Sequence, residues 1–266
     1  MAADVLVEAI RERRRSLLWW MLGIVALVAL TVAFYPSIRD DASLSDYAED
    51  LPESLRALFA GGEVEIASPA GYLNSQVYAL MAPLILLIFS IGAGAGAVAG
   101  EEERGTLDLL LAHPVRRRSY VIHRALALAV LVALLSAALL AAVALGSLAV
   151  DLEIGVDKLF AASASVGLLA LLFGAAALAA GAIRPGRSRA IAVASGLAVA
   201  AWIFDGLAQT VDALDPWRPL LPYYQALGEN PLRDGIPWDG WAILAAGTAL
   251  LVVVAAAGLE RRDVRQ

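Results

Sequence analysis

The chain lacks the residues from which many functional sites are built: it has no cysteine, two histidines and one lysine among 266 residues. Without cysteine there is neither a disulfide framework nor a cysteine-ligated metal site. The two histidines form no HExxH zinc pair, and the serine-hydrolase motif GxSxG is absent. No GxxxxGKS or GxxxxGKT phosphate-binding loop occurs either. We therefore expect no catalytic residue, no metal site and no cofactor in this chain.

Apolar residues, by contrast, are abundant: 60% of the chain is hydrophobic and the mean hydropathy is +0.72. Several apolar runs exceed the ~20 residues that a helix needs to cross a bilayer. We therefore predict an all-α membrane protein, with residues 1–266 forming a single transmembrane domain. Its six spans are expected at about residues 17–35, 72–99, 121–150, 159–183, 190–214 and 240–259. The net charge of −6 gives no reason to expect binding to nucleic acid.

The first apolar run and the residues before it have two interpretations. Residues 4–16 mix small apolar residues with four arginines, which is typical of a helix resting on an anionic membrane surface. We therefore expect residues 1–16 to form a cytoplasmic interfacial helix. A cleaved signal peptide is the alternative, but the run from Leu17 to Phe34 is longer than a signal core and no small-x-small cleavage site precedes Tyr35. We predict a permanent first span.

The basic residues predict the orientation of the chain. If both termini are cytoplasmic, fifteen of the twenty basic residues lie on the inner side and five on the outer side, a clear positive-inside bias. Residues 100–120 then form a cytoplasmic loop, and residues 36–71 and 215–239 form external loops. The 36–71 loop is acidic and contains helix-compatible spacing, so a substrate gate and a solvated cap are both open interpretations. The composition, rich in arginine and alanine, points to a bacterial plasma membrane.

Glycines recur at helical intervals in the second and fourth spans. A spacing of four relates Gly92, Gly96 and Gly100, and a spacing of seven relates Gly167, Gly174 and Gly181. Both spacings keep small residues on one face of a helix, where a second helix can approach closely. We predict helix packing at all six positions, within one subunit or between two.

The fifth span carries the most prominent polar residues inside a predicted membrane segment. Asp205 is followed by Gln209 and Asp212 at one-turn intervals on the same helical face. An ionised side chain at a helix centre costs roughly 2.5–3.5 kcal/mol, so such residues usually face a cavity or a partner. Two interpretations remain: this face lines the outer part of a translocation path, or Asp205 simply reaches the outer interface.

The segment 101–119 is the one strongly charged cluster between two long apolar runs. Helical spacing would place Glu101, Arg104 and Asp108 on one face and Leu107, Leu110 and Leu111 on another. Carboxylates in a first turn are favoured by the helix dipole, and Pro114 disfavours helix in the residue before it. The pattern predicts a short helix lying at an interface and ending near Pro114.

This segment also resembles a known family. The run from Glu101 to Leu111, followed by Pro114, Val115 and arginines 116–118, is similar to the cytoplasmic loop between the second and third spans of ABC-2 type transporter permeases. The resemblance extends more weakly over the whole chain, through the order of the spans. It implies the ABC-2, type V exporter-like architecture. It also implies that the loop is a coupling element that docks on a separate ATP-binding subunit.

What the resemblance implies for residues and partners is specific. The coupling residues are Glu101, Glu102, Glu103, Arg104, Thr106, Leu107, Leu110, Leu111 and Pro114. ATP and Mg would be bound by the partner ATPase, and two permease subunits, identical or different, would pair in the lipid bilayer. The expected function is outward transport of a substrate driven by ATP hydrolysis in that partner. Two other classes remain as alternatives: an ATP-independent carrier or channel, and a membrane scaffold that tethers a cytoplasmic partner.

Overall fold

The computed structural model describes residues 2–39, 68–105, 117–150, 152, 154–211 and 213–261, which form helices and their connections without any strand. The long helices are α1 (Ala2–Arg39), α5 (Met81–Ala97), α8 (Arg117–Ala149), α9 (Val156–Ile183), α10 (Arg187–Ala208) and α12 (Trp238–Glu260). The short ones are α4 (Pro69–Leu73), the π-helix η1 (Asn74–Tyr78), α6 (Ala99–Glu103), the 3₁₀-helix η2 (Asp215–Leu220), α11 (Pro222–Leu227) and the π-helix η3 (Asn230–Asp234).

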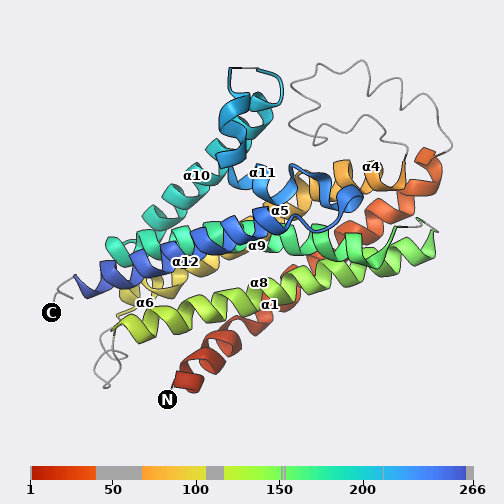
Figure 1. Cartoon of the computed structure of the whole chain (residues 1–266). Coiled ribbons are helices and arrows are strands. Elements are labelled where there is room, and N and C mark those ends of the chain that lie inside the picture. The colour runs from red at the N-terminus through yellow and green to blue at the C-terminus, as the bar shows by residue number, and fades with distance from the viewer. Residues whose placement is uncertain are drawn as a thin grey trace.

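Six helical segments of the described chain are long and apolar enough to cross a membrane. They are Arg13–Pro36, Pro69–Ala97, Arg117–Ala149, Val156–Ile183, Arg187–Ala208 and Trp238–Glu260. The second segment joins α4, η1 and α5. Both chain termini lie at one end of this bundle, which we call the terminal end, and α4 lies at the opposite end (Figure 1). The prediction of an all-α membrane protein with six spans is confirmed.

The boundaries of two spans differ from the predicted ones. Residues 2–22 contain neither glycine nor proline, so the predicted interfacial helix runs without a break into the first span, and α1 continues through Pro36 to Arg39. The fifth span ends at Ala208, six residues before the predicted end. There the backbone N–H and the hydroxyl of Thr210 both donate to the Leu207 carbonyl, which closes the helix in a turn. Most of the predicted 36–71 loop lies outside the described residues.

Helix α9 is the centre of the bundle. It packs against α5, α8, α10 and α12 (Figure 1). In its most apolar window 67% of the residues are buried, against 22% in α10 and in α12. The peripheral helices accordingly expose large apolar side chains, among them Leu197 and Leu250. Such an apolar exterior is what lipid requires of a membrane-spanning surface.

Small residues let the helices approach α9 closely. A Cβ atom on Gly174 would overlap the Ser90 hydroxyl of α5, and one on Gly167 would overlap the Ser136 hydroxyl of α8. A Cβ on Gly181 would lie 3.2 Å from the Ala99 side chain of α6. The α9 glycines therefore face three different neighbours within the subunit. Close packing in a bilayer relies on such contacts, because lipid tails give helices no hydrophobic reason to associate.

The three glycines at a spacing of four in the second span, Gly92, Gly96 and Gly100, do not pack against another helix in the same way. The tightest crossing of α5 over α9 is at Gly94, where a Cβ would overlap the Gly174 carbonyl oxygen. Gly94 is not one of the three glycines that the spacing singled out. A Cβ on Gly92 would meet no atom within 4 Å, so the predicted close packing at Gly92 is not found within the subunit. Gly96 and Gly100 lie against arginine side chains rather than a helix backbone.

We predict opposite effects for two alanine substitutions on α5. Gly94→Ala forces α5 away from the α9 backbone and should lower the free energy of unfolding by about 1–3 kcal/mol, the usual cost of overpacking. Gly92→Ala has open space and should be neutral or stabilising by up to about 1 kcal/mol, because alanine favours helix over glycine. Thermal unfolding of the purified variants in one detergent measures both. Equal melting temperatures would contradict the proposed crossing.

Candidate functional site

The predicted coupling segment begins in a short helix, α6, that is bent away from α5. Val98 has φ −120° and ψ −61°, which breaks the helix between Ala97 and Ala99. Gly105, at φ +69°, then ends the helical turn in a conformation that favours glycine. Thr106, Leu107, Leu110, Leu111 and Pro114 lie outside the described residues. The structure therefore describes only the start of the segment, residues 101–105.

Glu101 is buried at this base and is held by two arginines. Its side chain is only 5% exposed, and its Oε1 lies 2.6 Å from Arg104 Nη2 and 3.2 Å from Arg124 Nη2. The Arg104 contact confirms that Glu101 and Arg104 share a helical face. Arg124 comes from α8 and is itself largely buried. A buried carboxylate is tolerated only when it is paired, so this ion pair fixes α6 to α8.

Tyr120 strengthens the connection between α8 and the bend in α5. Its hydroxyl donates to the Ala97 carbonyl at 3.0 Å, an acceptor left at the end of α5. Arg124 Nε donates to the same hydroxyl at 3.1 Å, and the Arg124 guanidinium lies 5.3 Å from the centre of the Tyr120 ring. The hydroxyl thus links a backbone carbonyl of α5 to the arginine that pairs with Glu101.

Helix α1 reaches the same place through Arg13. Arg13 Nη2 donates to the Ala93 carbonyl at 3.3 Å, across the face of Gly96. Arg13, Glu101 and Arg124 line one small cavity of about 20 Å³. Gly96 therefore provides room for a guanidinium, which is a different role from the predicted helix packing.

Helices α10 and α12 are joined to this region as well. The backbone N–H of Arg187, the first residue of α10, donates to Glu103 Oε1 at 2.7 Å, so a carboxylate of α6 caps α10. The Arg187 side chain lies along Gly100. Arg117 Nη1, at the start of α8, donates to the Leu259 carbonyl of α12 at 3.3 Å. We call this set of contacts around α6 the junction.

The three glutamates of α6 thus differ in burial, a difference that the sequence pattern did not predict. Glu101 is buried, Glu102 is half-buried, and Glu103 and Arg104 are exposed. The predicted docking surface therefore includes Glu103 and Arg104, whereas Glu101 supports it from beneath. Arg124 was missed because it lies in the next span, 23 residues away. An arginine near the start of an apolar run is the only signal that sequence alone offers for it.

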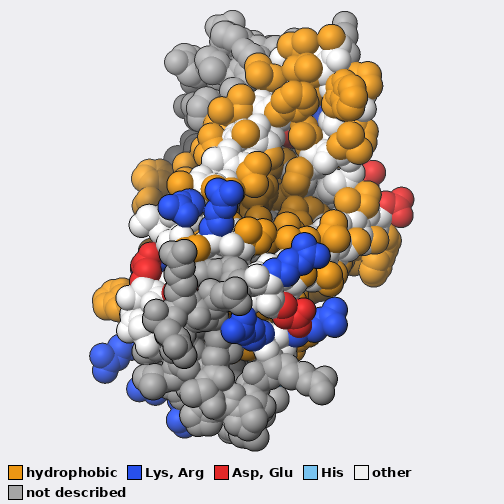
Figure 2. All heavy atoms as spheres, turned by 90° about the vertical axis from the view of Figure 1, so that its left-hand side faces the viewer, with side chains coloured by type: hydrophobic (Ala, Val, Ile, Leu, Met, Phe, Trp, Pro, Cys, Tyr) orange, Lys and Arg blue, Asp and Glu red, His pale blue; other side chains and the backbone are white. Residues whose placement is uncertain are grey.

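The terminal end around the junction is strongly basic. The exposed arginines here are Arg11, Arg14, Arg15, Arg104, Arg118, Arg184, Arg187, Arg189 and Arg261. In Figure 2, which looks onto this end, the basic side chains gather below a broad apolar region. The described side chains at the opposite end include fewer cations, namely Lys158, Arg218 and Arg233. The asymmetry that the sequence predicts is present in the folded chain.

At the opposite end, Asp205 pairs with a residue that sequence spacing did not indicate. Its Oδ1 lies 3.5 Å from Arg218 Nε of η2, and Gln209 Nε2 donates to its Oδ2 at 3.4 Å. The Arg218 guanidinium in turn lies 5.0 Å from the centre of the Tyr224 ring. Helix α10 ends at Ala208, and the predicted third residue of this face, Asp212, lies outside the described residues. Asp205 connects α10 to the η2 and α11 segments.

Tyr223 lies beside this ion pair in α11. Burial raises the pKa of its hydroxyl, and the negative charge of Asp205 raises it further. The tyrosine therefore remains neutral at physiological pH and packs its ring against Phe173 of α9, with 6.3 Å between ring centres. The Asp205 cluster, formed by Asp205, Gln209, Arg218 and Tyr223, is consequently attached to the central helix. Over the described residues, no group of three His, Cys, Asp or Glu side chains is arranged to hold a metal ion.

Comparison with known proteins agrees with this arrangement. The sequence profile of the ABC-2 family transporter proteins matches residues 5–264, nearly the whole chain. No curated protein is significantly similar to the chain. The profile match covers the six spans and the charged segment between the second and third, so the resemblance of residues 101–118 is confirmed at the level of the family. The chain belongs to the ABC-2 transporter family, as a multi-pass membrane permease.

Proposed function

We propose that this chain is the membrane subunit of an ATP-driven exporter, with ATP hydrolysis taking place in a separate ATP-binding subunit. The observation that supports the proposal is the junction: α6 leads directly into residues 106–116 and is bound to α8 through Glu101 and to α10 through Glu103. A push on those loop residues therefore acts on several spans at once. ATP and Mg would be held entirely by the partner.

The terminal end is the side on which the ATP-binding subunit would dock. Its nine exposed arginines favour the cytoplasmic face by the positive-inside rule. The same bias favours a cytoplasmic position for both termini, and the composition, rich in arginine and alanine, supports a bacterial plasma membrane as the location. Glu103, Arg104 and the loop residues Thr106, Leu107, Leu110, Leu111 and Pro114 form the docking surface in this proposal.

The transport cycle requires two permease subunits, identical or different, and two ATP-binding subunits. ATP-driven closure of the ATP-binding subunits would move α6 together with the ends of α8 and α10. This movement would be transmitted to Asp205 and Arg218 at the other end of α10. Helix α10, with 22 residues, runs from Glu103 of the junction to this ion pair. We place the outer part of the translocation path along Asp205, Gln209 and Asp212.

The junction generates a prediction about coupling. Glu101→Gln leaves Arg124 without its buried counter-charge and should cost about 3–5 kcal/mol of stability, with loss of coupled ATPase activity in the complex. Arg104→Gln is the matched control for the melting temperature only, because Arg104 is 58% exposed and its pair with Glu101 should contribute only about 0–1 kcal/mol. It is no control for the ATPase rate, since Arg104 belongs to the proposed docking surface. Melting temperature and ATPase rate of the isolated complex measure these effects. The double variant Glu101→Gln/Arg124→Gln should lose less stability than the two single variants together. A loss equal to the sum of the two single losses would contradict the pairing of Glu101 with Arg124.

Docking on an ATPase is tested by site-specific cross-linking. Because the chain has no cysteine, an introduced cysteine is its single site for labelling. A single cysteine in place of Leu110, carrying a photoreactive label, should capture a protein with a phosphate-binding loop in native membranes. A cysteine in place of Trp217, exposed at the opposite end, is the control and should not. Mass spectrometry identifies the captured chain. Capture of the same protein from both positions, or from neither, would argue against the docking surface.

The path through Asp205 is tested by removing one charge. Asp205→Asn should lower substrate-stimulated ATPase activity several-fold, because Arg218 loses its partner beside the path. Asp215→Asn is the control, since Asp215 is an exposed carboxylate in the same region. The comparison uses the complex reconstituted in vesicles. Unchanged transport and ATPase activity in Asp205→Asn would remove this residue from the path.

A further inference from the structure

Two arginine side chains from different helices meet over one glycine of α5. The position that a Cβ atom would take on Gly96 lies 2.5 Å from Arg13 Nη2 of α1 and 4.0 Å from Arg187 Nε of α10. The Cδ atom of Arg187 also lies 3.6 Å from the corresponding position on Gly100 of α6. Two cationic side chains that are far apart in the sequence therefore lie next to each other on α5 and α6.

Both arginines lie at the level of the membrane surface. Arg13 is the first residue of the first candidate span, and Arg187 is the first residue of the fifth. Gly96 immediately precedes Ala97, the last residue of the second span. Lipid headgroups occupy this level, and a basic side chain near the surface attracts anionic headgroups by about 1 kcal/mol. The position of the pair therefore brings it into contact with headgroups.

Positive charge exceeds negative charge in the junction. Its arginines outnumber the three glutamates of α6, and Glu101 and Glu103 are already engaged within the junction. The junction arginines are Arg13, Arg104, Arg117, Arg124 and Arg187. Arg184 and Arg189, in and after the turn between α9 and α10, are exposed and add to this excess. The carboxylates of α6 therefore do not neutralise this surface.

The Arg187 guanidinium is able to bind an anion from outside the chain. Arg187 is exposed, and within the described part of the chain its guanidinium makes no hydrogen bond or ion pair. Arg13 is half-buried and donates to the Ala93 carbonyl at 3.3 Å, but a guanidinium carries five N–H donors and can serve several acceptors at once. Two guanidinium groups held over one glycine repel each other. An anion bound by both would relieve this repulsion.

A phosphate group fits the pair better than a protein carboxylate does. Guanidinium groups bind phosphate oxygens through charge-assisted hydrogen bonds of about 2.7–2.9 Å. The distances from Gly96 bring Arg13 Nη2 and Arg187 Nε close enough for the oxygens of one phosphate to reach both side chains. Between Ile183, the end of α9, and Arg187 there is only a short turn. This part of the surface therefore stays at the headgroup level and does not project toward a protein partner.

We propose that Arg13 and Arg187 together bind the phosphate of an anionic headgroup over Gly96 at the membrane surface. The bound group joins α1 to α10 at the end of the bundle where α6 lies. A phosphate group is the shared chemistry of two sources, an anionic lipid and a soluble phosphate. The site requires no ATP-binding subunit, so its failure and the failure of the proposed exporter function are separate results.

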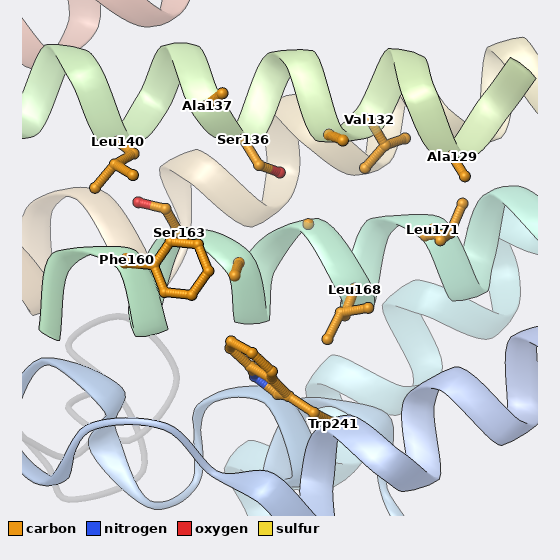
Figure 3. Close-up of a pocket in the computed structure, with 13 residues that line it drawn as sticks. Ala129, Val132, Ser136, Ala137, Leu140, Phe160, Ser163, Leu168, Leu171 and Trp241 are labelled. Atoms are coloured by element: carbon orange, nitrogen blue, oxygen red, sulfur yellow. The ribbon is translucent and has the colours of Figure 1, made fainter. Parts of the chain in front are cut away.

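Native mass spectrometry of the intact chain tests the site. The chain is gently extracted from vesicles of equal parts phosphatidylcholine and phosphatidylglycerol with the same acyl chains. We expect retained phosphatidylglycerol to exceed phosphatidylcholine about fivefold. A lipid that packs against an uncharged surface, such as the apolar groove between α8, α9 and α12 (Figure 3), gains nothing from a negative headgroup. Equal retention of the two lipids would overturn the proposal.

A charge-removing variant and its control locate the site. Arg187→Gln removes one of the two guanidinium groups and should reduce the preference for phosphatidylglycerol about threefold. Arg118→Gln is the matched control, because Arg118 is an exposed arginine of α8 at the same end of the bundle and should leave the preference unchanged. Equal losses in the two variants would show a diffuse attraction to the basic surface and contradict the site.

Two glycine variants test the geometry while every charge stays in place. A Cβ on Gly96 would overlap Arg13 Nη2, so Gly96→Ala must displace this guanidinium and should reduce the preference about threefold. The displaced atom is the far end of a flexible side chain, so the variant should fold. A Cβ on Gly100 makes only an ordinary contact with Arg187, and Gly100→Ala should keep the preference. An unchanged preference in Gly96→Ala would contradict the placement over Gly96.

Thermal unfolding in detergent separates the two sources. Inorganic phosphate and a short-chain phosphatidylglycerol are added separately, with sodium chloride at matched ionic strength as the control. A rise in melting temperature with inorganic phosphate that Arg187→Gln abolishes assigns a soluble phosphate, whereas a rise with the lipid alone assigns a headgroup. No rise with either would overturn the proposal. Loss of a bound protein from Arg187→Gln with unchanged lipid retention would show instead that a protein contacts Arg187, and would also contradict the site.

Discussion

The balance of charge around Glu101 is the constraint on which the terminal end of the structure depends. Among the described residues, Glu101 is the only buried Asp, Glu, Lys or Arg. An unpaired carboxylate there would be costly, so Arg124 must approach it, and α8 must therefore stay beside α6. Tyr120 follows from the same arrangement, since its hydroxyl serves both Arg124 and the Ala97 carbonyl. One buried charge thus organises the meeting point of three helices.

Close backbone approach plays the corresponding role within the membrane. Lipid gives no hydrophobic drive for helix association, so the bundle relies on packing that small residues permit. Gly94 and Gly174 bring α5 onto α9, and Gly167 brings α8 onto another part of it.

The two charged clusters lie at opposite ends of helix α10. The junction joins α6 to α8 and α10, and α1 to α5, at the terminal end. The Asp205 cluster ties the far end of α10 to η2 and α11. Helix α10 belongs to both clusters and is, with α12, the least buried of the six spans. In the proposed exporter it carries movement from the ATPase side to the outer side.

By itself the sequence determined the class of protein: runs of apolar residues long enough to span a bilayer, the bias of arginine to one side, and the charged segment that identifies the family. These are local or compositional properties, so they need no knowledge of contacts. Only the tertiary structure decided which side chains act together. The pairing of Glu101 with Arg124, the pairing of Asp205 with Arg218 and the choice of Gly94 over Gly92 join residues on different elements. The helical period defines the face on which a residue lies, but the neighbour of that face is set by how the six helices pack.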